Sequence, residues 1–374
     1  MKKLTVLIVA IIVAIGLSAC DSGEETIKIG VIGPLSGADS LYGVAVERGA
    51  KLAAKEINEA GGLFDKDFEV IAYDSKGQPD EGVNVYNRLV DQDEVDAIVG
   101  GTFSGVTLAI KDLAVQEGIP VLTPTATHPD VTLDADNIFR ACYTDSYQGE
   151  VAAQFAIETL EATKAAVFYN IDDAYSEGLA LAFIDAYEAA ELTIDDYTFN
   201  ANTDDYSAVL TTIQSGDYDV VFVPAYVASV GAILTQAATI DFGETIFMGG
   251  DGWDGIEGDY ADVAEGFYFV NHYAKTDPAQ NVQDFVANFT AEYGVAPNAL
   301  AALAYDAVYA LHAAFEDAGS TDRAAVIAAL ADLSYADAVT GAIAFDANGD
   351  PLKAITVIQV VEGTHVVIDK VQGS

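Results

Sequence analysis

Two loops rich in hydroxyl side chains follow neighbouring predicted strands of this chain. Residues 101–105 are Gly-Thr-Phe-Ser-Gly, and they lead from one strand into a helix. Residues 123–127 are Thr-Pro-Thr-Ala-Thr, and they follow the next strand. A serine at a helix start, such as Ser104, presents its hydroxyl together with free backbone N–H groups, which suits an anion. The two loops together would hold one carboxylate, although plain helix capping also explains each loop by itself.

The second half of the chain supplies the opposite polarity. Asp251 follows Gly249-Gly250 directly after a predicted strand, where a carboxylate has no evident structural duty. It can pair with an ammonium group. Tyrosines near further strand ends suit an apolar ligand side chain, with their phenols as polar contacts; they are Tyr42, Tyr175 and Tyr226. A carboxylate clamp, an acid and an aromatic chamber together indicate a site for an α-amino acid, whose zwitterion would bridge a cleft and favour its closed state.

An alternation of strands and helices must position these residues. In the first half, the predicted strands are 27–32, 68–73, 97–100 and 119–122, and the predicted helices are 42–60, 79–91 and 106–116. Successive units of this kind favour a parallel sheet with helices on both faces. Ligands bind to open sheets of this class beyond the carboxyl ends of the strands. The hydroxyl-rich loops lie at such ends.

The same alternation repeats in the second half, which predicts a second α/β domain. The predicted helices are 148–160, 176–190 and 230–240, and the predicted strands are 165–169, 219–223, 245–248 and 266–270. Three helices (281–293, 299–317 and 322–330) and terminal strands between 342 and 368 follow. No linker rich in proline or serine separates the halves. This favours two lobes with interleaved connectivity that close around a cleft.

The first twenty residues have the pattern of a secretory signal. A short basic start precedes an uncharged apolar run over residues 4–17, and Leu17-Ser-Ala-Cys20 closes it. The run is short for a membrane-spanning helix, which needs roughly 20 residues. The pattern resembles the signal peptides of bacterial lipoproteins. We therefore expect residues 1–20 to end in a lipidated Cys20, residues 21–26 to form a tether, and the mature protein to be anchored by lipid on the extracytoplasmic side of the cell membrane.

Composition and motif content exclude several function classes. The 59 acidic and 16 basic residues give a formal net charge of −43, which leaves no basic surface for nucleic acid. The sequence contains no HExxH or CxxC pattern, no P-loop and no GxSxG elbow. We therefore expect no metal, no cofactor and no enzymatic activity. Cys142 is interpreted as a buried small hydrophobe. Residues 346–350 imitate the start of a calcium-binding EF-hand loop, but Pro351 stands where that loop requires glycine and Val357 where it requires glutamate, so they are interpreted as a polar hairpin turn.

Taken together, several segments resemble the branched-chain amino-acid binding proteins of ABC importers, which have the type I periplasmic binding protein fold. The resemblance extends from about residue 27 to the C-terminus and rests on residues 31–37, 42–43, 57–62, 73–75, 123–129, 175–178 and 247–253. It implies a monomeric receptor that captures a branched-chain or other apolar amino acid and delivers it to a membrane permease. A sensory receptor module, and a binder of an amide or a small organic acid, remain the alternatives.

The resemblance also implies roles for single residues. Ser104 and Thr127 would hold the ligand carboxylate, with help from backbone groups at Thr125 and Ala126. Asp251 would accept the ammonium, where relatives often have Glu. The cleft tyrosines match Tyr42, Tyr175 and Tyr226, and Phe103 and Trp253 are possible additions to the pocket lining.

The same resemblance implies a division into lobes. Three crossings of the chain are expected near residues 144, 272 and 350. The first lobe would then comprise 27–144 with 273–350, and the second 145–272 with 351–374. A disulfide found near the cleft in some relatives has no cysteines here, because Ser75 and Phe103 stand in the corresponding places.

Overall fold

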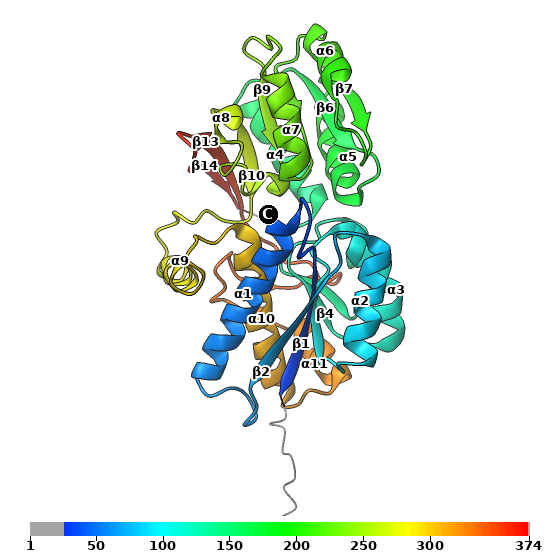
Figure 1. Cartoon of the computed structure of the whole chain (residues 1–374), viewed down its shortest axis with the longest axis vertical. Coiled ribbons are helices and arrows are strands. Elements are labelled where there is room, and N and C mark those ends of the chain that lie inside the picture. Colours follow the sequence, from blue (N-terminus) through cyan, green and yellow to red (C-terminus); the bar gives the residue numbers. More distant parts are fainter. Residues whose placement is uncertain (1–25, 373–374) are drawn as a thin grey trace, which may run out of the picture.

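The computed structural model describes residues 26–372, which form two lobes built on separate β-sheets (Figure 1). Residues 1–25 and 373–374 are not described, so the predicted signal peptide, Cys20 and most of the tether lie outside the described residues. In the part that is described, no helix combines the length and apolar character needed to cross a membrane. The predicted α/β class is confirmed.

The first lobe, at the lower end of Figure 1, contains a five-stranded parallel sheet in the order β2-β1-β3-β4-β5. The strand β1 (Ile27–Gly33) is almost entirely buried, because helices cover both faces of a parallel sheet. The other strands are β2 (Phe68–Asp74), β3 (Ala97–Gly100), β4 (Val121–Thr123) and β5 (Ile138–Arg140). The helices are α1 (Ser40–Glu59), α2 (Pro79–Asp91), α3 (Ser104–Glu117), η1 (Pro129–Val131), α9 (Gln280–Tyr293), α10 (Ala299–Ala318) and α11 (Arg323–Ala331).

The second lobe contains a seven-stranded sheet in the order β14-β13-β10-β9-β8-β6-β7. Its strands β6 to β10 run parallel, and the terminal hairpin of β13 and β14 adds antiparallel to β10. The strands are β6 (Lys164–Asn170), β7 (Thr193–Phe199), β8 (Val220–Phe222), β9 (Ile246–Gly249), β10 (Tyr268–Asn271), β13 (Ile355–Val361) and β14 (Thr364–Val371). The helices are α4 (Asp145–Glu158), α5 (Ala174–Ala189), α6 (Ser207–Ser215), α7 (Val227–Ala237), η2 (Asp251–Trp253) and α8 (Ala261–Ala264).

Within the described residues, the chain passes between the lobes three times. It does so between β5 and α4, between β10 and α9, and after the small β11–β12 pair (Ser334–Tyr335 and Ile343–Ala344), before β13. The limits of the lobes at single residues stay a prediction. Residues 346–350 form a turn in which the Asp346 N–H donates to the Asp350 carbonyl at 2.9 Å. The buried Arg140 holds this turn, since its Nε lies 2.5 Å from the Asp350 carboxylate.

Several short or exposed elements were missing from the sequence prediction, among them β7, α6 and β5. The strand β7 is an edge strand with mostly exposed residues, so it lacks the apolar run of a central strand. The helix α6 buries only Leu210 and Ile213, which gives a weak periodic signal. The strand β5 is three residues long. In each case, the local sequence gives only a weak signal, and packing against the rest of the lobe stabilises the element.

Helices α1 and α10 approach closely at Gly49. A Cβ atom at Gly49 would stand 2.0 Å from the backbone oxygen of Ala301. Gly105, near the start of α3, is a matched contrast, because the nearest atom to its Cβ would be in Pro79 at 4.0 Å. The first position has no room for a methyl group, and the second has.

We expect opposite effects from alanine at these two glycines. Gly49→Ala should lower the free energy of unfolding by about 1–3 kcal/mol, because the two helices must move apart. Gly105→Ala should raise it by up to about 1 kcal/mol, because alanine favours the helix more than glycine does. Urea denaturation followed by circular dichroism measures both. Similar changes in the two variants would contradict the close helix contact.

Candidate functional site

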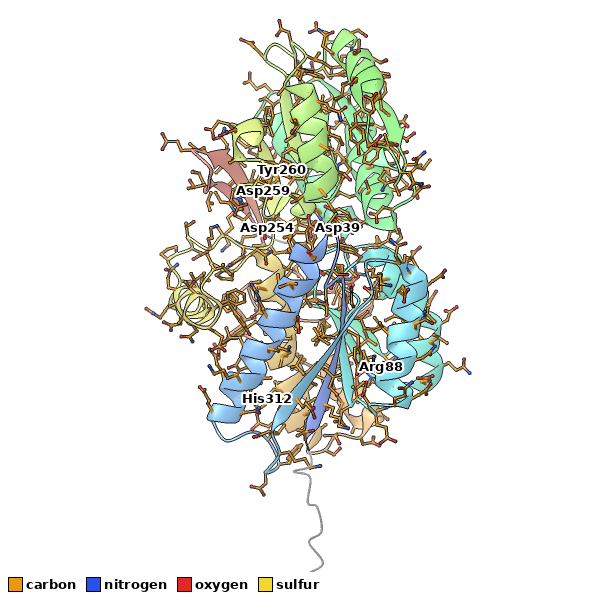
Figure 2. All side chains as sticks on the ribbon, viewed as in Figure 1. Asp39, Arg88, Asp254, Asp259, Tyr260 and His312 are labelled. Atoms are coloured by element: carbon orange, nitrogen blue, oxygen red, sulfur yellow. The ribbon has the colours of Figure 1, made fainter. Side chains whose placement is uncertain are left out.

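The side chain of Tyr42 joins the two lobes. Tyr42 lies near the start of α1, at the end of this helix that faces the second lobe (Figure 1). Its hydroxyl donates to the Gly252 carbonyl at 2.6 Å and accepts the Val227 N–H at 2.8 Å. Burial raises the pKa of Tyr42 well above its usual value, so the phenol keeps its proton. Asp39, just before α1, and Asp254 of the second lobe lie at the same level, where the lobes meet (Figure 2).

Aromatic rings from both lobes gather around Tyr42. The ring of Tyr226 stacks on Phe103 with centroids 4.3 Å apart, and on Tyr175 with centroids 5.1 Å apart. Tyr42 meets Tyr226 edge-on at 5.3 Å. The rings border a cavity of about 20 Å³, which is space for about one water molecule. Its lining residues are Tyr42, Thr102, Phe103, Thr125, Tyr175, Tyr226, Asp251, Gly252 and Leu300.

The two hydroxyl-rich loops lie side by side at the ends of β3 and β4. The Thr125 hydroxyl donates to the Thr102 carbonyl at 2.6 Å and so links the loops. Ser104 Oγ accepts the backbone N–H of His128 at 3.2 Å, which leaves the hydroxyl proton of Ser104 free for another acceptor. The Thr127 hydroxyl is buried and makes no hydrogen bond of good geometry within residues 26–372. Ser104 and Thr127 are therefore candidate donors, although neither is among the residues that line the cavity and the Thr127 hydroxyl also interacts with the buried Asp145 carboxyl.

Asp251 opens the short turn η2 and is held by two contacts. Its N–H donates to the Gln148 side chain at 2.8 Å, and its Oδ2 lies 2.9 Å from His272 Nε2. The His272 ring stacks on Tyr143 with centroids 3.7 Å apart. Burial lowers the pKa of His272, which favours the neutral imidazole as a hydrogen-bond donor to Asp251. The other oxygen, Oδ1, is buried without a hydrogen bond among the described residues, so it can accept a hydrogen bond from a ligand.

Several neighbours of these residues were not anticipated. Asp145, the first residue of α4, is fully buried near Thr127. Burial raises the pKa of the Asp145 carboxyl well above its usual value, and the Thr127 hydroxyl opposes this shift. An acid in the first turn of a helix is common, so it carried no functional signal. Leu300, at the start of α10, and the backbone of Gly252 also line the cavity without any chemical signature in the sequence.

Trp253, expected as a possible part of the pocket lining, does not line this cavity. Trp253 is completely buried, and its indole N–H donates to the Val223 carbonyl at 2.8 Å. Its ring packs against Gly249, where a Cβ would lie 2.0 Å from the indole. It therefore supports the Asp251 loop from behind and is absent from the cavity lining, whereas Phe103 is part of it.

Two further predicted positions are also buried. Ala126 is completely buried, and its carbonyl accepts a hydrogen bond from Arg140 at 2.9 Å. Cys142 is buried as well, and burial raises the pKa of its thiol to about 12, so it stays protonated. The Ala126 N–H also donates to Thr123 Oγ1 at 3.2 Å, so both backbone groups of Ala126 have partners within the protein. Cys142 fills space as a small apolar residue.

Two α/β lobes that the chain joins three times, with polar and aromatic groups of both lobes facing each other at the interface, define a two-lobed ligand-binding protein. A family model described as periplasmic binding protein matches residues 26–364, and the chain belongs to this family.

Relatives and solved structures agree with this assignment. The Leu/Ile/Val-binding protein BraC3 of Rhizobium johnstonii is 32% identical over 355 residues, which cover 94% of either chain. The leucine-binding protein LivK of Thermotoga maritima has a TM-score of 0.87 at 30% identity, covering 93% of this chain and 99% of that one. The substrate-binding protein LivJ of Streptococcus pneumoniae, solved with isoleucine, has a TM-score of 0.86 at 31% identity, with the same coverage of 93% and 99%. The predicted type I fold and the predicted family resemblance are confirmed.

We expect His272 to make the stability of the fold depend on pH. Because burial lowers the pKa of folded His272, the unfolded chain takes up a proton at higher pH than the folded chain does. The stability that neutral His272 contributes is present above about pH 6.5 and is lost as the pH falls through the folded-state pKa. Urea unfolding between about pH 8 and about pH 5 should therefore show a steeper loss in wild type than in His272→Gln. Parallel curves would argue against a depressed His272 pKa.

Proposed function

We propose that this protein is the substrate-binding component of an ABC importer and that its ligand is an α-amino acid with an apolar, branched side chain. The observation that carries the proposal is the opposed polarity across the interface between the lobes. Hydroxyl donors at Ser104 and Thr127 belong to the first lobe, and the Asp251 carboxylate with its unpaired Oδ1 belongs to the second. The relatives named as binding proteins for leucine, isoleucine and valine support the same ligand class.

The ligand would lie with its carboxylate toward the first lobe. The start of α3 presents unpaired backbone N–H groups and the positive end of the helix dipole, which favour an anion. The ammonium would then face Asp251 Oδ1. Each end of the zwitterion meets a complementary group in a site with little water, where charge–charge interactions are stronger than in bulk solvent.

Binding would require the lobes to separate first. A cavity of about 20 Å³ is far too small for an amino acid, and the stacked rings of Phe103 and Tyr226 occupy the space between the lobes. The ligand would enter an open form, displace this stack and be enclosed as the lobes close. The three connections between the lobes would serve as the hinge.

The role at the membrane is part of the proposal. Lipidation at Cys20 would keep the receptor on the extracytoplasmic side and close to its permease, which raises its local concentration there. The protein would act as a monomer and would release the ligand chemically unchanged.

The sharpest test of the ligand class concerns Asp251. Asp251→Asn should weaken leucine binding by about 2–5 kcal/mol, because the ligand ammonium loses its charged partner in a buried site. Binding of 4-methylpentanoate, which is leucine without its amino group, should change much less. Isothermal calorimetry with both ligands and both proteins gives a complete thermodynamic cycle.

A control for this test is Asp262→Asn, which removes an exposed acid from a nearby part of the same lobe. It should bind leucine like wild type. If Asp251→Asn loses equal affinity for both ligands, Asp251 shapes its loop and does not read the amine, and an organic acid or amide becomes the better ligand class.

The contact made by Tyr42 predicts a second effect. Tyr42→Phe should weaken ligand binding by about 1–3 kcal/mol, because the buried Val227 N–H loses its partner in the closed form. Tyr187→Phe is the matched control, since the buried Tyr187 hydroxyl makes no hydrogen bond in the described structure. Calorimetry should leave the Tyr187 variant unchanged. Equal affinities of Tyr42→Phe and wild type would mean that the interlobe hydrogen bonds do not support closure.

A further inference from the structure

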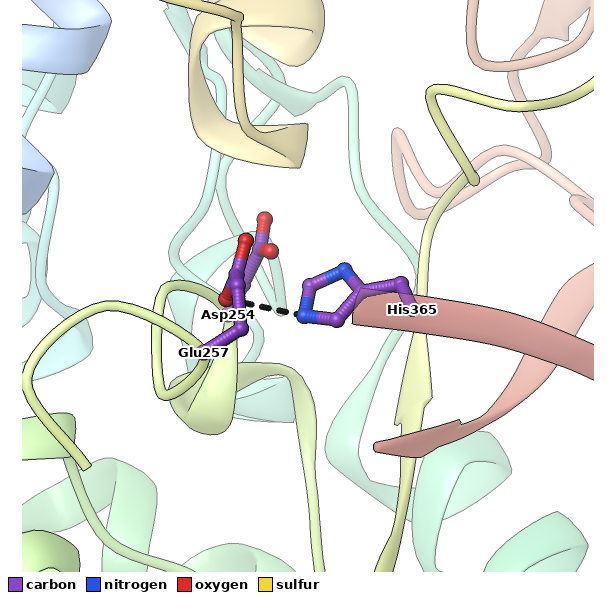
Figure 3. A group of neighbouring side chains, drawn as sticks. All are labelled: Asp254, Glu257 and His365. Carbon is purple, nitrogen blue, oxygen red and sulfur yellow. Dashed lines mark ion pairs between the residues drawn. The ribbon is translucent and has the colours of Figure 1, made fainter. Parts of the chain in front are cut away.

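Asp254 and Glu257, on the loop that also carries Asp251, converge with His365 of β14 (Figure 3). One potential ligand atom from each residue lies within 4.8 Å of the others. Asp254 and Glu257 belong to the segment after η2, whereas His365 is the second residue of β14. Asp254 is 2% exposed and His365 is 7% exposed, so both are shielded from solvent, whereas Glu257 is partly exposed. None of the three lines the cavity between the lobes.

The imidazole of His365 points at the two carboxylates, as Figure 3 shows. Its Nε2 lies 2.8 Å from Glu257 Oε2. The contact lacks the in-line geometry of a hydrogen bond, and neither atom has another hydrogen-bond partner among residues 26–372. The ring of Phe269 meets the His365 ring edge-on at 5.0 Å and fixes its orientation. A buried imidazole nitrogen and two carboxylates thus face a common point.

We propose that Asp254, Glu257 and His365 bind one divalent transition-metal ion of the Zn²⁺ type. Zn²⁺ takes imidazole nitrogen and carboxylate oxygen at roughly 2.0–2.2 Å, so its tetrahedral ligand atoms stand roughly 3.3 Å apart. In the cluster, the His365–Glu257 pair is 2.8 Å apart and all three ligand atoms lie within 4.8 Å of one another, so side-chain adjustments would bring them to this spacing. A water molecule would complete the coordination. Mg²⁺ and Ca²⁺ prefer more oxygen ligands and little nitrogen, so the site should discriminate against them.

Neighbouring groups hold the two carboxylates in place for this task. Lys275 Nζ lies 3.1 Å from Glu257 Oε1, which leaves Oε2 to face the metal position. Asp254 Oδ2 accepts the Ala299 N–H at 2.6 Å. Hydrogen-bonded carboxylates of this kind are typical of metal sites.

The hydrogen bond from the Ala299 N–H to Asp254 places the proposed metal site at the interface between the lobes. Ala299 is the first residue of α10 in the first lobe, whereas Asp254 belongs to the second lobe. A metal bound by Asp254 would brace the loop that also carries Asp251. The inference does not depend on which ligand the interlobe cavity takes.

The test is an isothermal calorimetric titration of the purified full-length mature protein with ZnCl₂ in the presence of excess Mg²⁺. The Mg²⁺ occupies the diffuse negative surface of a chain with net charge −43. Wild type should bind one Zn²⁺ per chain. His365→Gln should lower the affinity at least about tenfold, as should Glu257→Gln, since each removes a donor. His312→Gln is the matched control, because His312 lies outside the cluster, next to Phe68, and it should bind like wild type.

Two further readouts keep the result decisive. Co²⁺ should give visible absorption bands of a four- or five-coordinate site in wild type and in His312→Gln, and lose them in His365→Gln. Circular dichroism confirms that each variant is folded. If wild type shows no saturable Zn²⁺ binding above the Mg²⁺ background, or if His365→Gln and Glu257→Gln bind like wild type, the three residues are a plain ion-pair network and the proposal is wrong.

Discussion

One phenol links the backbones of the two lobes beside the cavity. The Val227 N–H and the Gly252 carbonyl are both buried, and a buried backbone group without a partner costs about 1–3 kcal/mol. The Tyr42 hydroxyl satisfies both of them from the other lobe. Val227 directly follows Tyr226, and Gly252 directly follows Asp251, so this single contact also determines how the aromatic rings and the acid face the first lobe. Any movement that admits a ligand must break these two bonds, and closure must form them again.

The loop that carries Asp251 packs closely against its neighbours. A side chain at Gly250 would come within 2.4 Å of Gln148 Oε1, so the strand end can approach Gln148 only as glycine. Trp253 packs beneath the loop, and His272 holds the Asp251 carboxylate from the side. His272 lies where the chain leaves β10 for the first lobe. Asp251, which is proposed to bind the ligand ammonium, therefore contacts His272 in a connection between the lobes that must bend when the lobes move.

The same loop links two chemically distinct places. Asp251, at its start, faces the aromatic cavity, and Asp254 turns toward His365 and the start of α10. A metal at the second place would stiffen the loop without touching the ligand. In a chain with this much negative charge, a buried cluster with an imidazole is the feature that separates a specific cation site from the diffuse attraction of the surface.

Local sequence determined the parts of this protein whose signal is continuous along the chain. The apolar run at 27–32 predicted a central strand, because strands covered on both faces need no polar alternation, whereas the exposed edge strand β7 carried no such run. The strand-end rule also indicated the neighbourhood of Thr125, Tyr226 and Asp251, since the carboxyl ends of parallel strands converge at one edge.

Tertiary structure alone decided which way side chains point and which distant residues meet. Trp253 lies next to the site in sequence yet points into the core, because Gly249 opens space for the indole there. The cluster of Asp254, Glu257 and His365 joins a loop to the last strand, and its members have no spacing that a motif could record. Contacts of this kind depend on how sheets and lobes pack, and the order of residues along the chain does not encode them locally.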